Sequence, residues 1–200
     1  MSNNPTPLLG DIHKGLLFVL SAPAGTGKTT LVEMLMEEFS CVQESVSLTT
    51  RPPRSNEVDG KHYYFVSEEE FKEKIEAGEF LEHAKVFGYR YGTSSLVLRR
   101  QQEGGSHVIL TIDTQGALQV KGKVPAVFIF LRPPSTEELS RRLYDRKTES
   151  EEVIAERLRW SEKELALAKQ YDYNIINDDL NTAYQVLRSI LIAEEHRVRE

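Results

Sequence analysis

The sequence predicts an α/β fold with a doubly wound parallel sheet at its core, a small mixed-sheet insert and a helical segment near the C-terminal third. Three observations indicate this class. Short apolar runs alternate with longer amphipathic stretches along most of the 200 residues, a pattern typical of parallel strands covered by helices on both faces. A glycine-containing loop joins the first apolar run to the first amphipathic stretch. The alternation stops over 45–92, which is rich in Thr, Tyr, Arg and Gly.

Four apolar runs are expected to form the core strands. Each is short and largely apolar, as expected for a strand buried on both faces of a sheet. The second run ends in an acid, and the third is closed by two prolines that cannot continue a strand. The four runs are 16–20, 108–113, 127–131 and 173–176.

Two long helices are predicted from hydrophobic spacing. The first starts near Lys28, where Leu31, Met34 and Leu35 recur at the spacing of one helical face. The last starts near Thr182 and carries a similar apolar stripe. Helices of this kind cover a parallel sheet by burying the apolar face and leaving the polar face in water.

Two further helices are indicated by capping signals. Ser135 followed by Glu138, and Ser67 followed by Glu70, each place a hydroxyl three residues before an acid, the pattern of a capping box. The second pair lies inside the stretch that interrupts the alternation, so we expect that insert to combine short strands with one helix. The predicted organisation is a flexible tail (1–14), then one domain (15–194) with a core (15–44, 106–134, 160–194), an insert (45–105) and a helical lid (135–159).

The composition restricts the partners of the protein. It has 25 basic against 31 acidic residues and a net charge of −6, which argues against nucleic acid or an anionic membrane as the main partner. A single cysteine, Cys41, excludes an intrachain disulfide. The first fourteen residues contain no apolar run of signal-peptide length. We therefore expect a soluble cytoplasmic protein, with its oligomeric state left open.

The loop between the first strand and the first helix has the composition of a P-loop. Small residues allow backbone N–H groups to converge on phosphate oxygens at a helix N-terminus, so the loop predicts a P-loop NTPase fold that binds ATP or GTP. Lys28 would reach the β- and γ-phosphates, and the Thr29 hydroxyl would coordinate Mg²⁺. The first position is alanine rather than the usual glycine. The loop consists of Ala22, Pro23, Ala24, Gly25, Thr26, Gly27, Lys28 and Thr29.

Motifs after the P-loop resemble the guanylate kinase family, and the likeness covers about residues 15–193. The resemblance implies a nucleoside monophosphate kinase that transfers the terminal phosphoryl group of ATP to GMP, with Mg²⁺ as cofactor and ATP and GMP as partners. The motifs that carry it are SLTTRPPR (47–54), EVDGKHYYF (57–65), FLE (80–82), YGT (91–93) and IDTQG (112–116).

The same resemblance implies a binding site for GMP. Arginine forks suit phosphate oxygens, and a carboxylate such as Glu82 can accept from the adjacent N1–H and N2–H groups of guanine. Each residue also has a structural interpretation: loop arginines can be solvated, and the tyrosines, hydroxyls and acids can be ordinary strand residues. The implied residues are Ser47, Arg51, Arg54, Tyr63, Glu82, Tyr91, Gly92, Thr93 and Asp113.

The helical segment 135–159 resembles the lid of this family. Arg142 and Arg146 are four apart and share one helix face. The resemblance implies that they close over the ATP phosphates together with Arg157 and act with Lys28 in catalysis. The alternative is a solvated, salt-bridged helix pair. Asn177 is implied to lie beside the adenine, or else in a loop that caps the last helix.

Two positions depart from the family pattern, and two other functions remain open. Thr111 stands where the family usually has the first acid of an Asp-x-Asp pair, of which Asp113 is the second. Lys147 stands where glycine is common in the lid. A neutral hydroxyl at 111 would weaken the ordering of Mg²⁺. The rival functions are a non-catalytic guanylate-kinase-like module that binds phosphopeptides, and a related kinase whose acceptor is a phosphorylated ribose.

Overall fold

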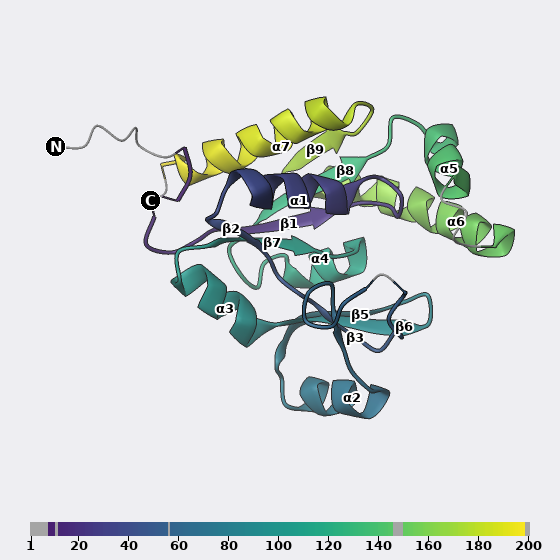
Figure 1. The fold of residues 1–200 in the computed structure, drawn as a ribbon, viewed down its shortest axis with the longest axis horizontal. Coiled ribbons are helices and arrows are strands. Elements are labelled where there is room, and N and C mark those ends of the chain that lie inside the picture. The colour runs from purple at the N-terminus through teal and green to yellow at the C-terminus, as the bar shows by residue number, and fades with distance from the viewer. Residues whose placement is uncertain (1–7, 11, 56, 146–149, 199–200) are drawn as a thin grey trace.

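The computed structural model describes residues 8–10, 12–55, 57–145 and 150–198. A five-stranded core sheet occupies the centre of the molecule (Figure 1). All of its neighbouring strands are parallel, in the order β2-β7-β1-β8-β9. The predicted doubly wound parallel core is confirmed. Its strands are β1 (Leu17–Ser21), β2 (Val42–Glu44), β7 (His107–Thr111), β8 (Val127–Arg132) and β9 (Tyr173–Ile176).

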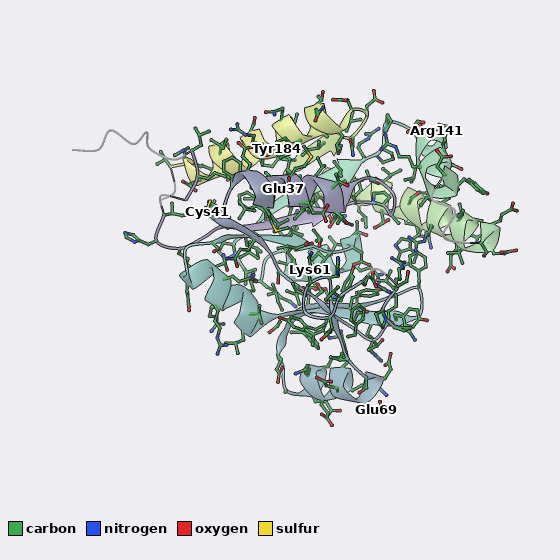
Figure 2. All side chains as sticks on the ribbon, viewed as in Figure 1. Glu37, Cys41, Lys61, Glu69, Arg141 and Tyr184 are labelled. Carbon is green, nitrogen blue, oxygen red and sulfur yellow. The ribbon has the colours of Figure 1, made fainter. Side chains whose placement is uncertain are left out.

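Helices cover both faces of this sheet. Phe18 and Leu20 of β1 pack with α1 (Lys28–Glu38) and α7 (Leu180–Glu195), where Tyr184 joins the cluster (Figure 2). Leu17 and Val19 point the opposite way and pack with α3 (Ser95–Glu103) and α4 (Thr114–Val120). Alternate residues of one strand thus enter two separate cores, because successive side chains of a strand face opposite sides.

The insert forms a second sheet of mixed direction, as the sequence predicts. Its order is β4-β3-β6-β5, with β3 parallel to β4 and antiparallel to β6. Phe71 anchors helix α2 by stacking on Phe80, with ring centroids 4.6 Å apart. The elements are β3 (Leu48–Thr49), β4 (Tyr64–Phe65), α2 (Glu68–Glu76), β5 (Phe80–Val86) and β6 (Tyr89–Ser94).

Both predicted capping serines begin helices. The Ser67 hydroxyl accepts a hydrogen bond from Glu70 N at 3.0 Å, and Ser135 accepts from Glu138 N at 3.2 Å at the start of α5 (Thr136–Asp145). Helix α6 (Glu151–Leu167) continues into a short 3₁₀ turn (Ala168–Gln170). It runs past residue 159, so the predicted lid boundary falls inside one helix. In the described parts of the chain, no helix has the length and apolar character needed to cross a bilayer.

The chain is anchored earlier than the predicted tail suggests. Within the stretch 1–14, Leu9 is only 4% exposed and packs into the core. The Gly10 N–H donates to Glu195 Oε2 at 2.8 Å, and the same carboxylate lies 2.5 Å from Nε2 of the buried His107. The end of α7 therefore ties the N-terminal segment to the core sheet.

We expect Glu195→Ala to lower the free energy of unfolding by about 3 kcal/mol, because it removes the acceptor for the buried His107 ring and for the Gly10 N–H. His107 Nδ1 accepts from Leu16 N at 3.2 Å, so Nε2 is the ring atom that carries the proton toward Glu195. Urea denaturation measures the change, with Glu103→Ala on the exposed end of α3 as control. Equal urea midpoints for the two variants would contradict a stabilising role for this carboxylate.

Candidate active site

The loop between β1 and α1 is fixed by two glycines and by its own hydrogen bonds. Gly25 and Gly27 have φ angles of 88° and 93°, a left-handed region that favours glycine. A Cβ atom at position 27 would also lie 2.6 Å from Asn177 Nδ2. The Thr26 hydroxyl donates to Pro23 O at 2.8 Å and holds the curl of the loop. The predicted P-loop residues therefore form a compact turn at the carboxyl edge of the sheet.

Lys28 is the first residue of α1 and closes this turn. Its ammonium donates to Ala22 O at 3.0 Å and so spans the loop. Burial lowers its pKa, and the charges of Glu164, Asp113 and Glu44 oppose that shift. A cation at a helix N-terminus and at the mouth of a glycine-rich turn is well placed to bind an anion.

Asn177 supports the loop from behind. Its side chain is only 4% exposed, and Nδ2 donates to Thr26 O at 2.7 Å. Its backbone N–H donates to Arg132 O at 2.9 Å. Asp179 in the same loop caps α7, as the alternative interpretation of this loop expected. The implied contact of Asn177 with adenine stays a prediction.

Asn177→Ala is expected to lower the free energy of unfolding by about 1–3 kcal/mol, since the buried Thr26 carbonyl loses its donor. The loop should also hold phosphate less firmly. Urea denaturation measures the first effect. Asn174→Ala, on the exposed side of β9, is the matched control. If the two variants unfold at the same urea concentration, Asn177 does not support the loop.

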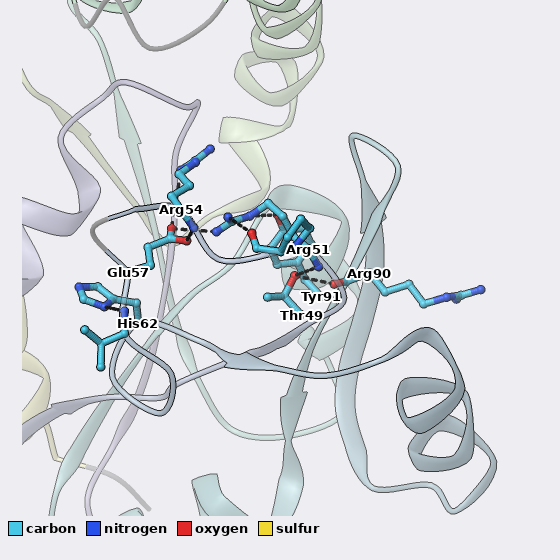
Figure 3. Close-up of polar contacts among 9 residues, drawn as sticks. Thr49, Arg51, Arg54, Glu57, His62, Arg90 and Tyr91 are labelled. Atoms are coloured by element: carbon cyan, nitrogen blue, oxygen red, sulfur yellow. Dashed lines mark hydrogen bonds and ion pairs between the residues drawn. The ribbon is translucent and has the colours of Figure 1, made fainter.

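A cluster of arginine and tyrosine side chains lies in the insert (Figure 3). Arg51 donates through one terminal nitrogen to Glu57 Oε1 at 2.8 Å and through Nε to the Tyr91 hydroxyl at 3.3 Å. Its guanidinium lies 5.4 Å from the centroid of Tyr63. Arg54 donates its backbone N–H to Glu57 Oε2 at 2.8 Å, while its side chain is 58% exposed. Both predicted arginines and both tyrosines thus come together.

Glu57 holds this arginine cluster together, and the sequence analysis assigned it no role. The signal available was an acid three residues after Arg54, inside the EVDGKHYYF motif. The Thr49 hydroxyl accepts from Arg51 N at 3.2 Å and donates to Arg90 O at 2.9 Å, which ties the arginine loop to β6. The guanidinium of Arg51 is therefore held in place by side chains and by the sheet.

Two acids lie on either side of the turn that starts α4. Glu82 on β5 is 3% exposed, and its Oε1 accepts from the Thr93 hydroxyl at 2.6 Å. A Cβ atom at Gly116 would lie 2.5 Å from Glu82 Oε2, and Gly116 N donates to Asp113 Oδ1 at 2.8 Å. Burial raises the pKa of Glu82 to about 7, and the charge of Asp113 adds to the effect.

Two other predicted contact residues have structural tasks of their own. Gly92 pairs with β3 and β5, and a Cβ atom there would come within 2.8 Å of the Phe80 ring. Ser47 is 8% exposed, and its carbonyl accepts from Tyr64 N at 2.9 Å. Glycine at 92 is therefore required for packing, whatever it contributes to a ligand.

Helix α5 rests on the P-loop through apolar contacts. A Cβ atom at Gly25 would lie 3.0 Å from Leu143 Cδ2. Arg142 donates from Nε to Glu138 Oε1 at 2.7 Å, and its neighbour Arg141 is an exposed partner of the same acid. Arg146, predicted to complete the lid, and Lys147 lie outside the described residues.

Arg157 contacts the tip of the insert hairpin. Its guanidinium lies 5.4 Å from the ring centroid of Phe87, and that ring lies 6.1 Å from Trp160. Phe87 has a φ of 47°, unusual for a residue other than glycine. The insert and α6 therefore meet through an aromatic contact that holds one predicted lid arginine.

Thr111 has an acid beside it. Its hydroxyl donates to Glu44 Oε1 at 2.5 Å, from the end of β7 to the end of β2. Burial raises the pKa of Glu44, while Thr111 and Lys28 act in the opposite direction. The neutral residue at 111 is thus in direct contact with a carboxylate that the sequence analysis did not assign.

Comparison with known proteins agrees with this geometry. The guanylate kinase family model matches residues 14–194. The guanylate kinase of Protochlamydia amoebophila (strain UWE25) is 58% identical over 94% of this chain and 96% of its own length; that of Desulfitobacterium hafniense (strain Y51) is 50% identical over 94% of each. The crystal structure of guanylate kinase from Anaplasma phagocytophilum matches with a TM-score of 0.76 at 34% identity, covering 96% of this chain and 91% of that one. The chain belongs to the guanylate kinase family.

Proposed function

We propose that the protein is a guanylate kinase that transfers the terminal phosphoryl group of ATP to GMP, giving ADP and GDP. The observation that carries the proposal is the pairing of two sites through one acid. Asp113 interacts electrostatically with Lys28 of the P-loop and with Glu82 of the insert. ATP held at the P-loop and GMP held by the insert would therefore be neighbours, with Asp113 between the donor site and the base-reading Glu82.

The P-loop would bind the ATP phosphates. Backbone N–H groups of residues 25–29 and the N-terminus of α1 supply positive potential. Lys28 adds a full charge and would stabilise the β- and γ-phosphate oxygens as the bond between them breaks. The acceptor needs no protein base, since the second pKa of a phosphate monoester is about 6 and its oxygens are largely deprotonated at neutral pH.

The insert would bind GMP. Arg51 and Arg54 would hold the phosphate, with hydroxyl groups of Tyr63 and Tyr91 as additional donors. In exchange, Arg51 would share or release Glu57, which now accepts its hydrogen bond. Glu82 would accept from guanine N1–H and N2–H, aided by Asp113. The remaining proposed contacts on the O6 side are Ser47 and Thr93.

The residues around the P-loop fit Mg²⁺ by their chemistry. Thr29 is exposed on the first turn of α1, and the carboxylates of Glu44 and Asp113 are the strand-end acids that act on Lys28. Hydroxyl and carboxylate oxygens are the ligands that this hard cation prefers, directly or through water. When bound with ATP, Mg²⁺ would neutralise charge on the phosphates, and the Thr29 hydroxyl would be its protein ligand.

The lid arginines would act at the transferring group. Arg142, Arg146 and Arg157 carry charge that can stabilise the phosphoryl oxygens in the transition state. In the described residues Arg142 binds Glu138 and Arg157 lies against Phe87. We propose that closure of the lid over both nucleotides redirects these arginines toward the phosphates.

An assay of ADP release tests the proposal. Mg-ATP is supplied with GMP, AMP, UMP or ribose bisphosphate at equal concentration, and we expect rapid turnover with GMP alone. Turnover with ribose bisphosphate would favour the related kinase. Binding of GMP without turnover would favour the phosphopeptide-binding module, against which the intact Lys28 and Thr29 already argue.

A further inference from the structure

Two neighbouring strands place a hydroxyl and a carboxylate at the edge of the sheet that holds the P-loop. Strands β2 and β7 run parallel, with Glu44 paired to Ile109, so both strands end at the same edge of the core sheet. Thr111 also pairs with Leu20 of β1, two residues before the P-loop begins. The hydrogen bond from the Thr111 hydroxyl to Glu44 Oε1, 2.5 Å long, fixes the carboxylate at this edge.

The carboxylate of Glu44 lies at the end of β2, near enough to the P-loop lysine for their charges to interact. It interacts electrostatically with Lys28, and also with Glu33 of α1 and His62 of the insert. An acid here is costly in two ways: it is desolvated, and it would repel the phosphates of a nucleotide bound at the P-loop. Thr111 and Lys28 offset part of the first cost, and a second cation between the carboxylate and the phosphates would offset both.

The other two acids that act on Lys28 are less suited to that task. Asp113 caps α4 through Oδ1 and accepts from Gln115 through Oδ2. Glu164 lies on α6, the helix that belongs partly to the lid. Glu44 is on the rigid core sheet, and Thr111 is its hydrogen-bond partner there.

We propose that Glu44 is a positioning residue for Mg-ATP, whose carboxylate accepts hydrogen bonds from the hydration shell of the magnesium ion while Thr111 holds that carboxylate in place. The inference rests on the proposed use of ATP. It places the magnesium-orienting acid on β2, the neighbour of the strand where the sequence analysis looked for one. Residues that orient the ligands of a metal in this way typically change its affinity by about 10–100-fold.

Nucleotide binding without turnover tests the inference. Calorimetry gives the dissociation constants of a non-hydrolysable ATP analogue with Mg²⁺ and with EDTA. The value with EDTA divided by the value with Mg²⁺ measures how much the metal tightens binding. We expect Glu44→Gln to reduce that ratio about tenfold. The metal-free analogue should bind the variant as tightly as the wild type or more tightly, because one repulsive charge is gone. Glu37→Gln, with the same charge change on the exposed side of α1, should leave the ratio unchanged.

A second variant transfers the acid from position 44 on β2 to position 111 on β7, its hydrogen-bond partner. In Glu44→Gln/Thr111→Asp the carboxylate stands on β7, within reach of the position that the Glu44 carboxylate occupies in the wild type. We expect the ratio of the two dissociation constants to recover most of its wild-type value. An unchanged ratio in Glu44→Gln, or no recovery in a double variant with native circular dichroism, would overturn the inference. The measurement contains no GMP. A wild type that binds Mg-ATP normally but does not phosphorylate GMP would therefore contradict the proposed function and leave this inference standing.

Discussion

Lys28→Ala is expected to lower kcat for transfer from ATP to GMP by about 1,000-fold while the protein stays folded. Removing a single preorganised group that stabilises transition-state charge costs about 10²–10³ in rate, and Lys28 carries a full charge at the position where the β–γ bond breaks. In the absence of nucleotide its ammonium binds only one loop carbonyl in the described structure, that of Ala22. Its burial is itself unfavourable, as the lowered pKa indicates.

The measurement is steady-state ADP release at saturating GMP and Mg-ATP. Lys14→Ala is a suitable control, since Lys14 is an exposed lysine just before β1. Its kcat should match that of the wild type. A Lys28→Ala enzyme that keeps more than a tenth of the wild-type kcat would show that the P-loop does not hold the transferred phosphate as proposed.

The core of the fold could be predicted because its strands are buried on both faces. The run 173–176 matches β9 at both ends, and 16–20 lies one residue from β1. Strand β2 was not predicted, since it has three residues and only Val42 among them is buried. The contact of Glu44 with Thr111 follows from β2, so no local pattern could indicate it.

The sequence motifs predicted which residues make up the candidate site. They predicted less well which side chains contact each other within it. The motifs contain Arg51, Arg54, their tyrosines and Glu57, but they did not indicate that Glu57 joins the two arginines. The motifs also gave no sign that the Asn177 amide binds a carbonyl 151 positions away in the sequence. Motifs specify which groups a site needs, while contacts between distant segments depend on how the sheet brings them together.

Asp113 shows why the two sites form one unit. It caps α4 at the end of a core strand, and its charge acts on Lys28 and Glu82 at once. A change in the charge of either site is therefore felt at the other.

Glu82→Gln is expected to raise the KM for GMP about 30–100-fold and to leave the KM for ATP within about twofold. Guanine presents two donors, N1–H and N2–H, to this side chain. A carboxylate offers an acceptor to each, whereas an amide offers one acceptor and one donor. The lost hydrogen bond leaves buried polar groups unpaired, at a cost of about 2–3 kcal/mol, and each 1.4 kcal/mol is about tenfold. Glu79→Gln, exposed just before β5, is the matched control.

The same residue predicts a pH dependence. The pKa of Glu82 is raised to about 7 in the protein without nucleotide, so the carboxyl is protonated below pH 7 and presents a donor where guanine needs an acceptor. The kcat/KM for GMP, which reports ionisations of the free enzyme, should therefore rise between pH 6 and 8 and then level off. The phosphate of GMP ionises near pH 6 in both enzymes, so the step near pH 7 should be missing in Glu82→Gln. A step of equal size in the variant would assign the titration to another group and remove Glu82 from base recognition.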